Sequence, residues 1–327
     1  MNKPSFDPGF TEKYRGDLRR IINPSGQFNV RRCGTTWRDI HPYLFMINAP
    51  WPVFAAMIFG GFVIANAAFA LIYVKIGVGH LQGADTSTAL SRFLSAFFFS
   101  AQTFTTVGYG RISPDGVLTS MVASLQALLG LMALAIGTGL LFGRFSRPAA
   151  RLAFSKQMVM SPYQSGTSLQ LRVANRRSNN LMEVEARVML STVVTSDQGT
   201  HREFQYLPLE RRVIQFLPLS WTIVHPIDES SPLWARKPED LAAEQAEFLV
   251  LIKAFDDTFF QTVHVRYSYR HDEVVWGARF VPAFEPDAQG EMVLDLRKLS
   301  EIAPAESPGN PKKVHHPGAL LGGMDDQ

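Results

Sequence analysis

The sequence has very little cysteine: Cys33 is the single one among 327 residues. An intrachain disulfide is therefore excluded, and a reducing compartment for the water-exposed part of the chain is unopposed. The sequence also lacks a glycine-rich phosphate loop, a cluster of metal ligands and a nucleophile motif. His225 and Asp228 in "VHPIDESSPL" resemble a hydrolase pair, but a lone His-Asp pair beside prolines is typically structural. We predict that the chain is not an enzyme and carries no organic cofactor.

A strong charge of either sign is missing as well. Lys and Arg number 32 against 29 Asp and Glu, and the formal charge of +3 is too small for a nucleic-acid-binding surface. The first thirty residues are polar and basic without an apolar run, so we expect no cleavable signal peptide. Hydrophobic residues make up 46% of the chain, and they are concentrated between residues 51 and 145. We expect one part of the chain to lie in lipid and the rest in water.

Three long segments contain no charged residue. "WPVFAAMIFGGFVIANAAFALIYV", Trp51–Val74, and "GVLTSMVASLQALLGLMALAIGTGLLFG", Gly116–Gly143, are each long enough to cross a bilayer, which takes about 20 residues. Between them lies "FLSAFFFSAQTFTTVGYG", Phe93–Gly110. Hydropathy alone does not decide whether this middle segment is a third crossing.

The basic residues decide the topology. Cytoplasmic flanks of membrane helices carry an excess of Lys and Arg, and here both flanks are basic. Eight such residues precede Pro50 and four follow the second span: Lys3, Lys13, Arg15, Arg19, Arg20, Arg31, Arg32 and Arg38, then Arg144, Arg147, Arg151 and Lys156. Three crossings would place the two flanks on opposite sides, whereas two crossings place both in the cytoplasm. The middle segment is therefore predicted to enter and leave the membrane by the outer face.

The middle segment itself favours this topology. A short helix is expected from about Ser91, and Gly108 and Gly110 oppose its continuation. Non-helical backbone survives at membrane depth only where it is buried in protein or lines a water-filled path. Alternating normal and left-handed dihedrals, which glycine tolerates, would point successive carbonyls at one axis. We expect "TTVGYG" to line a pore, with the Thr106 hydroxyl at its inner end and with Val107 and Tyr109 turned away to pack against the short helix.

The second span has one face of special interest. Gly130, Leu134, Thr138 and Phe142 recur every four residues and therefore share a face. That face either lines the pore or packs against a neighbour. If it lines the pore, Phe142 is a hydrophobic constriction that stops ions by dewetting. Gly130 is either a bend or a close-contact site.

Basic and aromatic residues mark the inner membrane surface. The four basic residues after the second span fix the topology, and anionic lipid binding is the further hypothesis for them. Before the first span, residues 37–50 mix aromatic and basic side chains and are predicted to form an interfacial helix. Pro42 either interrupts or starts this helix.

From about residue 157 the pattern changes to the alternation of β-strands. Leu169, Leu171 and Val173 share one face of "SLQLRVAN", and a β-sandwich is expected because turn residues separate several such segments. The other strand candidates are "EVEARVMLSTVV", "HREFQYLPL", "VIQFLPLSWTIV", "AEFLVLIKAF", "TVHVRYSY", "EVVWGARFVPAF" and "EMVLDL".

Several motifs together resemble one family. "TVGYG" is similar to the selectivity filter of potassium channels, and "SWTIVHPIDESSPL" (220–233), "EVVWGARF" (273–280), "VANRR" (173–177) and "RFSRP" (144–148) extend the likeness from about residue 37 to 302. The chain resembles the inwardly rectifying potassium channels, especially their prokaryotic (KirBac-type) branch. The resemblance implies a membrane α-helical pore domain with two transmembrane helices, a re-entrant pore helix and a filter. It also implies an all-β, immunoglobulin-like cytoplasmic domain.

The resemblance further implies a homotetramer in a bacterial inner membrane, with both termini cytoplasmic, anionic phospholipids as partners and no nucleic acid. Domains are expected at 1–36 (cytoplasmic), 37–50 (interfacial helix), 51–148 (pore), 149–303 (β-sandwich) and 304–327 (disordered tail).

The resemblance also implies roles for individual residues. Permeant K⁺ would bind at Thr106, Val107, Gly108 and Tyr109, with Gly110 completing the filter. Cavity and gate positions are Gly130, Leu134, Thr138 and Phe142; lipid positions are Arg144, Arg147, Arg151 and Lys156; cytoplasmic pore positions are Glu185 and Glu273.

The chain departs from the family pattern at two places. Leu134 stands where strongly rectifying members have an acidic residue, so strong rectification is not expected, although Glu185 and Glu273 would concentrate cations. Gln102 beside Arg111 removes the glutamate-arginine pair that many relatives have behind the filter. Two alternatives stay open: a weakly selective cation channel and a membrane-anchored sensor whose β-domain binds a partner.

Overall fold

The computed structural model describes residues 9, 20–34, 36, 41–147, 150–164, 166–196 and 199–305. Residues 37–40 of the expected interfacial helix and residues 306–327 of the expected tail lie outside this part. The chain divides into two compact units, which we treat separately. The first, called the membrane unit, is Arg32–Arg147, and the second, called the β unit, combines Met1–Arg31 with Pro148–Gln327.

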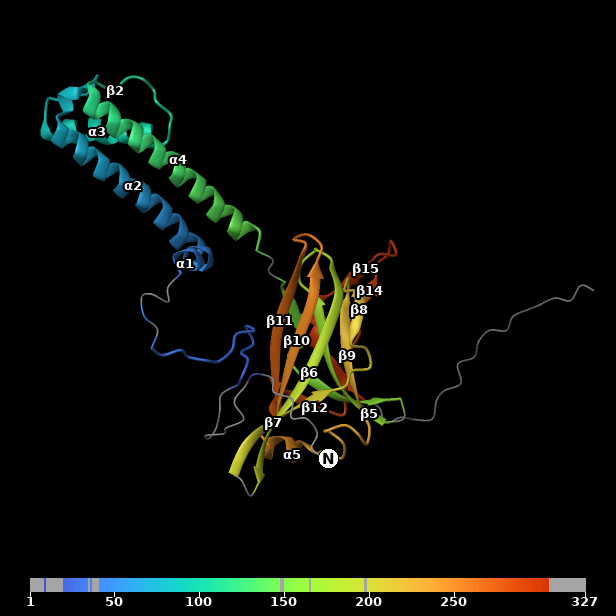
Figure 1. Cartoon of the computed structure of the whole chain (residues 1–327). Helices are drawn as coiled ribbons and strands as arrows, with labels where there is room; N and C mark the ends of the chain where they lie inside the picture. The colour runs from blue at the N-terminus through green and yellow to red at the C-terminus, as the bar shows by residue number, and fades with distance from the viewer. Residues whose placement is uncertain are drawn as a thin grey trace, which may run out of the picture. The chain divides into compact units, whose positions relative to one another are not determined.

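The membrane unit is helical (Figure 1). Two of its helices, α2 and α4, are long and apolar enough to cross a membrane, by length and composition. Its elements are α1 (Pro42–Asn48), α2 (Trp51–Ile76), a 3₁₀ turn (Val78–His80), α3 (Ala89–Phe104), α4 (Val117–Phe145) and the short antiparallel pair β1 (Leu81–Gln82) and β2 (Ser113–Pro114). The predicted spans and the short helix between them are confirmed, within a few residues at each end.

Local sequence explains where these helices begin and end. Pro42 occupies the first turn of α1, where a missing backbone N–H costs nothing, so it starts this helix and does not interrupt it. Thr88 caps α3, because its hydroxyl accepts the Ser91 N–H at 3.0 Å. Gly77 follows α2 with a φ of 114°, and Gly116 precedes α4 with a φ of 84°. Both values lie in the region that glycine tolerates best.

The β unit contains two five-stranded sheets. One has the order β11-β10-β6-β7 with β8 beside β6, and the other has the order β12-β4-β5-β3 with β9 beside β5. The first sheet consists of β6 (Leu181–Ser196), β7 (Gly199–Leu207), β8 (Val213–Phe216), β10 (Glu247–Asp256) and β11 (Gln261–Arg270). The second consists of β3 (Leu152–Phe154), β4 (Met158–Tyr163), β5 (Gly166–Asn175), β9 (Ser220–Ile227) and β12 (Val274–Trp276).

Shorter elements complete the β unit. Two antiparallel pairs lie outside the main sheets, and one short helix precedes β10. These elements are β13 (Ala278–Phe280) with β16 (Ile302–Pro304), β14 (Phe284–Pro286) with β15 (Met292–Leu294), α5 (Pro238–Ala243), and the 3₁₀ turns His271–Glu273 and Leu296–Ser300.

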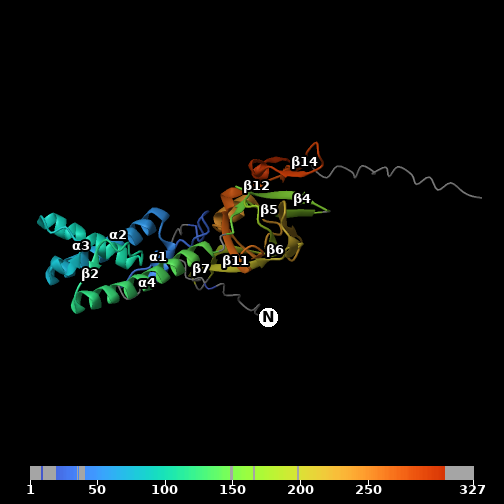
Figure 2. The same cartoon turned by 90° about the horizontal axis from the view of Figure 1, so that it is seen from above.

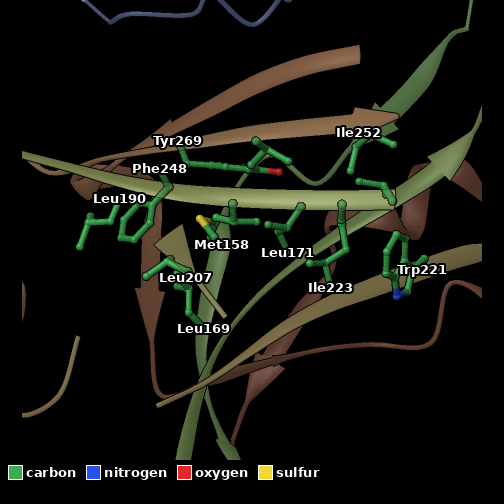
Figure 3. Close-up of a cluster of buried hydrophobic side chains, with 14 of the residues drawn as sticks. Met158, Leu169, Leu171, Leu190, Leu207, Trp221, Ile223, Phe248, Ile252 and Tyr269 are labelled. Carbon is green, nitrogen blue, oxygen red and sulfur yellow. The ribbon is translucent and has the colours of Figure 1, made fainter. Parts of the chain in front are cut away.

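The two main sheets enclose one apolar core. Figure 2 shows β4 and β5 on one side of the sandwich and β6 and β11 on the other. Leu169, Leu171 and Val173 of β5 are buried in this core, as the alternation predicts. Phe248 and Tyr269 from the opposite sheet are also fully buried in it (Figure 3). The predicted all-β sandwich is confirmed.

Some strands were not visible in the sequence. The candidate over residues 213–224 is two strands, β8 and β9, and the candidate over residues 273–284 is interrupted at Gly277, which has a φ of 67°. β4 has four consecutive buried residues at its start, so it lacks the alternation of a half-exposed strand.

Candidate functional site

The segment after α3 has an alternating backbone. Thr106, Gly108 and Gly110 have φ angles of 58°, 56° and 78°, so every second residue is left-handed. This is the alternation that the carbonyl argument requires. The C-terminal end of α3 holds the segment, because the Gln102 carbonyl accepts the N–H groups of Val107 at 2.9 Å and of Gly108 at 3.4 Å. Thr106 adopts the left-handed conformation without being glycine, which costs on the order of 1 kcal/mol.

Gln102 also holds the other end of this segment. Its side-chain Nε2 donates to the Ile112 carbonyl at 3.1 Å, while its backbone carbonyl holds Val107. One residue therefore fixes the segment before and after the two glycines. Because residue 102 is glutamine, the glutamate-arginine pair of many relatives is not expected here. The Gln102 side chain forms this neutral hydrogen bond instead, which the sequence did not reveal.

Val107 and Tyr109 lie at a pocket beside α3 without being buried. They line, together with Phe98 and Gln102, an open pocket of about 520 Å³. In the single chain Val107 is 52% exposed and Tyr109 is 83% exposed. Both side chains share this pocket with residues of α3, and most of the tyrosine is uncovered in the single chain, so their packing against α3 stays a prediction.

Gly130 differs from the other three residues of its predicted face. It is buried on α4, and a Cβ atom there would lie 2.8 Å from the Phe104 carbonyl carbon and closer still to its oxygen. The helix continues through this position to Phe145. Of the two roles considered for Gly130, the close-contact site is the one observed, at the point where α3 ends and the left-handed segment begins.

Leu134, Thr138 and Phe142 are exposed in the single chain. Leu134 is 64% exposed and Phe142 is 71% exposed, while the Thr138 hydroxyl donates to the Leu134 carbonyl at 2.9 Å. The part of α4 after Gly130 therefore has an exposed apolar face, which includes one hydroxyl group, that of Thr138.

Arg144 forms its hydrogen bonds inside the membrane unit. Its Nη1 donates to the carbonyls of Met46 and Ile47 at 2.7 and 2.9 Å, and its Nη2 donates to the Ala49 carbonyl at 2.8 Å. These carbonyls lie at the end of α1, where a helix has no partners of its own for them. The sequence prediction placed this residue in a lipid cluster and missed that it caps α1.

Aromatic rings complete the surroundings of Arg144. The guanidinium carbon lies 4.5 Å from the ring centroids of both Trp51 and Phe54, a distance at which a cation is attracted to the ring face. Its Nε has no hydrogen-bond partner among the described residues. Gly143, next to it, allows Tyr43 and Ile47 of α1 to approach α4 closely. Arg144 and Gly143 together join α1 to the end of α4.

The other three predicted lipid residues are more accessible. Arg147 is exposed and donates to the Asn48 side-chain oxygen. Arg151 and Lys156 are exposed and belong to the β unit. The structure therefore divides the predicted cluster between the two units.

Glu185 is not a free carboxylate. Its Oε1 lies 2.9 Å from Arg187 Nε and 2.6 Å from Arg212 Nη2, and its side chain is 15% exposed. Hydrogen bonds from these two arginines, led by Arg187, lower the pKa of Glu185. The expectation that this residue concentrates cations loses its electrostatic basis, because two positive charges face one negative charge.

Glu273 is also paired. Its carboxylate accepts Arg20 Nη1 at 3.0 Å and lies 2.9 Å from Arg20 Nη2. It also accepts the Arg270 N–H at 2.8 Å. The basic N-terminal segment thus supplies a partner that the sequence argument did not anticipate, and the expected attraction for cations is reduced here too.

Buried groups of the β unit hold the same N-terminal segment. The Glu247 carboxylate is 4% exposed and accepts the Ile21 N–H at 2.9 and 3.0 Å. The Ser268 hydroxyl donates to the Ile22 carbonyl at 2.8 Å. Ile22 itself packs against Leu249 in a small apolar cluster. Residues near the start of the chain are therefore anchored on β10 and β11.

His225 is structural. It is 2% exposed, with Nδ1 lying 2.5 Å from the Pro208 carbonyl and Nε2 lying 2.8 Å from the Ser231 hydroxyl. A carbonyl only accepts, so Nδ1 carries the proton and Nε2 accepts from Ser231. Burial lowers the pKa of His225. Asp228 instead accepts bonds from Ser230, and no hydrogen bond joins Asp228 to His225 within the described part of the chain.

Comparisons with known proteins agree with this architecture. A family profile described as "Inward rectifier potassium channel C-terminal domain" matches residues 152–316, and a profile described as "Ion channel" matches residues 53–147. The chain is 38% identical to "Inward rectifier potassium channel Kirbac3.1" of Paramagnetospirillum magnetotacticum over 288 residues, which are 87% of this chain and 96% of that protein. The chain belongs to the inward rectifier potassium channels, on their KirBac-type branch.

Relatives from mammals extend the family assignment. The chain is 30% identical to "G protein-activated inward rectifier potassium channel 3" of Mus musculus over 310 residues, which are 84% of this chain and 76% of that protein. It is 31% identical to "Inward rectifier potassium channel 4" of Mesocricetus auratus over 205 residues, 58% of this chain and 45% of that protein. The family consists of membrane channels, so the predictions of a membrane protein and of a chain that is not an enzyme are confirmed.

Clusters of conventional metal ligands do not compete with this assignment. Among the described residues, no group of three or more His, Cys, Asp or Glu side chains is arranged to hold a metal ion.

Proposed function

We propose that four copies of this chain form a potassium-selective pore in which their Thr106–Gly110 segments surround one axis. The alternating φ angles at Thr106, Gly108 and Gly110 carry the proposal. Carbonyls that point to a common axis replace the hydration shell of an ion without a full negative charge. Thr106, Val107, Gly108 and Tyr109 would coordinate K⁺, the permeant ion.

The end of α3 supports this role. A helix concentrates about half a negative charge at its C-terminus, and α3 ends at Phe104, directly before the left-handed segment. A cation at the inner end of the filter is therefore stabilised by the pore helix as well as by carbonyls. Both contributions favour cations and disfavour anions.

Exposed apolar residues support the tetramer. One loop cannot surround an ion, and Val107, Leu134 and Phe142 are 52%, 64% and 71% exposed in the single chain. Side chains of this kind are covered by lipid or by a neighbouring subunit. We propose the homotetramer in a bacterial inner membrane, with both termini in the cytoplasm according to the distribution of basic residues.

We place the gate at Phe142. This residue lies on the exposed face of α4 with Leu134 and Thr138, close to the cytoplasmic end. An apolar ring at a narrow point excludes water and therefore ions. Phe142→Ala is expected to raise ion flux into vesicles that contain the purified protein, by at most about tenfold. Leu131→Ala, also exposed on α4, is the matched control, and unchanged flux in the Phe142 variant would contradict the assignment.

Anionic lipid is the proposed modulator. Arg147, Arg151 and Lys156 are exposed, and each basic residue near an anionic surface gains about 1 kcal/mol. Arg144 contributes through its links to α1. Strong rectification is not proposed, because Leu134 is apolar and Glu185 and Glu273 are paired with arginines.

Cation uptake by liposomes tests the proposal. Purified full-length protein is reconstituted, and uptake of rubidium and of sodium is compared with and without barium. Barium-sensitive rubidium uptake that exceeds sodium uptake is expected. Equal uptake of both ions would indicate a weakly selective cation channel. Uptake of neither ion across a series of anionic lipid contents would favour the membrane-anchored sensor.

A further inference from the structure

Four polar side chains are completely enclosed within the membrane unit. Tyr73 and Asn66 come from α2, Ser100 from α3 and Gln126 from α4. Asn66, Ser100 and Gln126 are 0% exposed and Tyr73 is 1% exposed. These four residues, which we call the polar chain, are linked by hydrogen bonds across all three long helices of the unit.

The hydrogen bonds of the polar chain run in one direction. Tyr73 Oη donates to Gln126 Oε1 at 2.8 Å, and Gln126 Nε2 donates to Ser100 Oγ at 2.5 Å and to the Ser100 carbonyl at 3.0 Å. Ser100 Oγ then donates to Asn66 Oδ1 at 2.8 Å, and Asn66 Nδ2 donates to the Phe62 carbonyl at 2.8 Å. Each amide orientation is fixed by a backbone carbonyl, because the carbonyls of Ser100 and Phe62 only accept and therefore require the amide nitrogens of Gln126 and Asn66.

The polar chain holds α3 at a defined place. Ser100 lies one half-turn before Gln102, whose carbonyl accepts Val107 and Gly108 and whose side chain holds Ile112. It lies one turn before Phe104, which contacts Gly130. A small rotation or sliding of α3 would move Ser100 away from Gln126 and would move the Gln102 carbonyl by the same amount.

Apolar contacts alone would not fix α3 so closely. Tyr73, Phe99, Ala96 and Ala70 also pack between the helices, and these apolar contacts are less directional than hydrogen bonds. Polar side chains inside a membrane are expensive unless they are satisfied, and they generally have functions. A hydrogen bond loses most of its strength when its partners shift or tilt, so the polar chain defines one depth and one rotation of α3.

We propose that Tyr73, Asn66, Ser100 and Gln126 are positioning residues for the filter, and that they set how strongly the pore discriminates K⁺ from Na⁺. This inference rests on the proposed function, since it presupposes conduction through Thr106–Gly110. The polar chain touches no ion and acts through the Gln102 carbonyl. Its loss should therefore change selectivity more than it changes the amount of assembled protein.

Two tyrosine variants separate positioning from stability. Tyr73→Phe removes the hydroxyl that Gln126 accepts, and Tyr269→Phe removes a buried hydroxyl that donates to the Ser155 carbonyl at 2.9 Å in the β unit. The change in chemistry is the same, but only Tyr73 belongs to the polar chain. The ratio of rubidium to sodium uptake is expected to fall about threefold in Tyr73→Phe and to stay unchanged in Tyr269→Phe.

Gln126→Leu removes three hydrogen bonds of the polar chain, and a decrease of about tenfold or more in the same ratio is expected. If this variant does not assemble, Tyr73→Phe decides alone. The inference is overturned if the wild type is selective and Tyr73→Phe keeps its ratio, or if Tyr269→Phe lowers the ratio as much. Absence of rubidium uptake in the wild type would instead refute the proposed function itself.

Discussion

The two units of the chain differ in how far they cover their large apolar side chains. The β unit encloses its own core, where Phe248 and Tyr269 are 0% exposed. The membrane unit leaves large side chains uncovered, such as Val117 at 79% and Phe142 at 71%. The β unit therefore has a core of its own, whereas the exposed apolar side chains of the membrane unit fit the proposed contacts with lipid and with further subunits.

The units also differ in the structural role of their glycines. In the membrane unit, glycine permits a close contact at Gly130 and a left-handed backbone at Gly110. In the β unit, Gly290 has a similar φ of 85° in a surface turn between β14 and β15. The same local conformation therefore lies in the proposed filter in one unit and in a surface turn in the other. Matched substitutions can test this difference.

The largest effect is expected at Gly130. Gly130→Val would place its side chain against the backbone of Phe104. Relieving this clash requires one of the two helices to move, at a cost above about 3 kcal/mol per chain. We therefore expect assembly and ion flux to be abolished. Gly137→Val is the control on the same helix, since a Cβ there meets no described atom within 4 Å. Size-exclusion chromatography and rubidium uptake check both variants, and an active Gly130→Val protein would contradict the close contact.

The next effect concerns the conformation of the proposed filter. Gly110→Ala forces a left-handed alanine, which costs about 1–2 kcal/mol per chain, in a segment whose carbonyls must stay aligned. Loss of the preference for rubidium over sodium is expected, while the assembled protein persists. Gly290→Ala carries a similar backbone cost in the β unit and should lower thermal stability slightly with normal selectivity. Equal selectivity in the two variants would remove the distinction between the units.

Arg144 should give an intermediate effect. Arg144→Lys removes the planar guanidinium that reaches three carbonyls at the end of α1, and a lysine cannot reproduce that geometry. The expected loss of stability is about 2 kcal/mol, measured as the melting temperature of the full chain in detergent. Arg147→Lys, at an exposed position, should change stability by less than about 0.5 kcal/mol. Comparable losses in both variants would argue against the cap on α1.

The smallest effect is a pH dependence of the β unit. Burial holds the pKa of His225 below its ordinary value of 6.5. Above this pH both the folded and the unfolded chain are neutral at His225, whereas below it the unfolded chain binds a proton before the folded one does. Stability is therefore lost as the pH falls from about 6.5 toward the lowered pKa.

The measurement is the melting temperature of the full chain between pH 7.5 and 5.5. A decrease of about 2 °C that depends on His225 is expected. His225→Asn, whose amide can still donate to the Pro208 carbonyl, should show a weaker decrease over this range. An equal decrease in the wild type and in the variant would show that another group is responsible.

The sequence predicted most of the architecture because long uncharged runs and period-two strands have strong patterns. The spans around Phe54 and Gly130, and the alternation at Leu169, followed from hydropathy alone. The role of Arg144 did not follow, because its partners are backbone carbonyls of a helix nearly one hundred residues earlier. The pairing of Glu185 with Arg212 and of Glu273 with Arg20 was equally hidden, since each pair forms only after the strands are assembled.

The most direct test of a potassium-selective pore built on Thr106–Gly110 is its reversal potential in a planar bilayer. Purified wild-type protein is recorded with potassium on one side and sodium on the other. A reversal potential far from zero, with the potassium side negative, is predicted, with this preference lost in Gly110→Ala. A wild-type current that reverses near zero under these conditions would contradict the account.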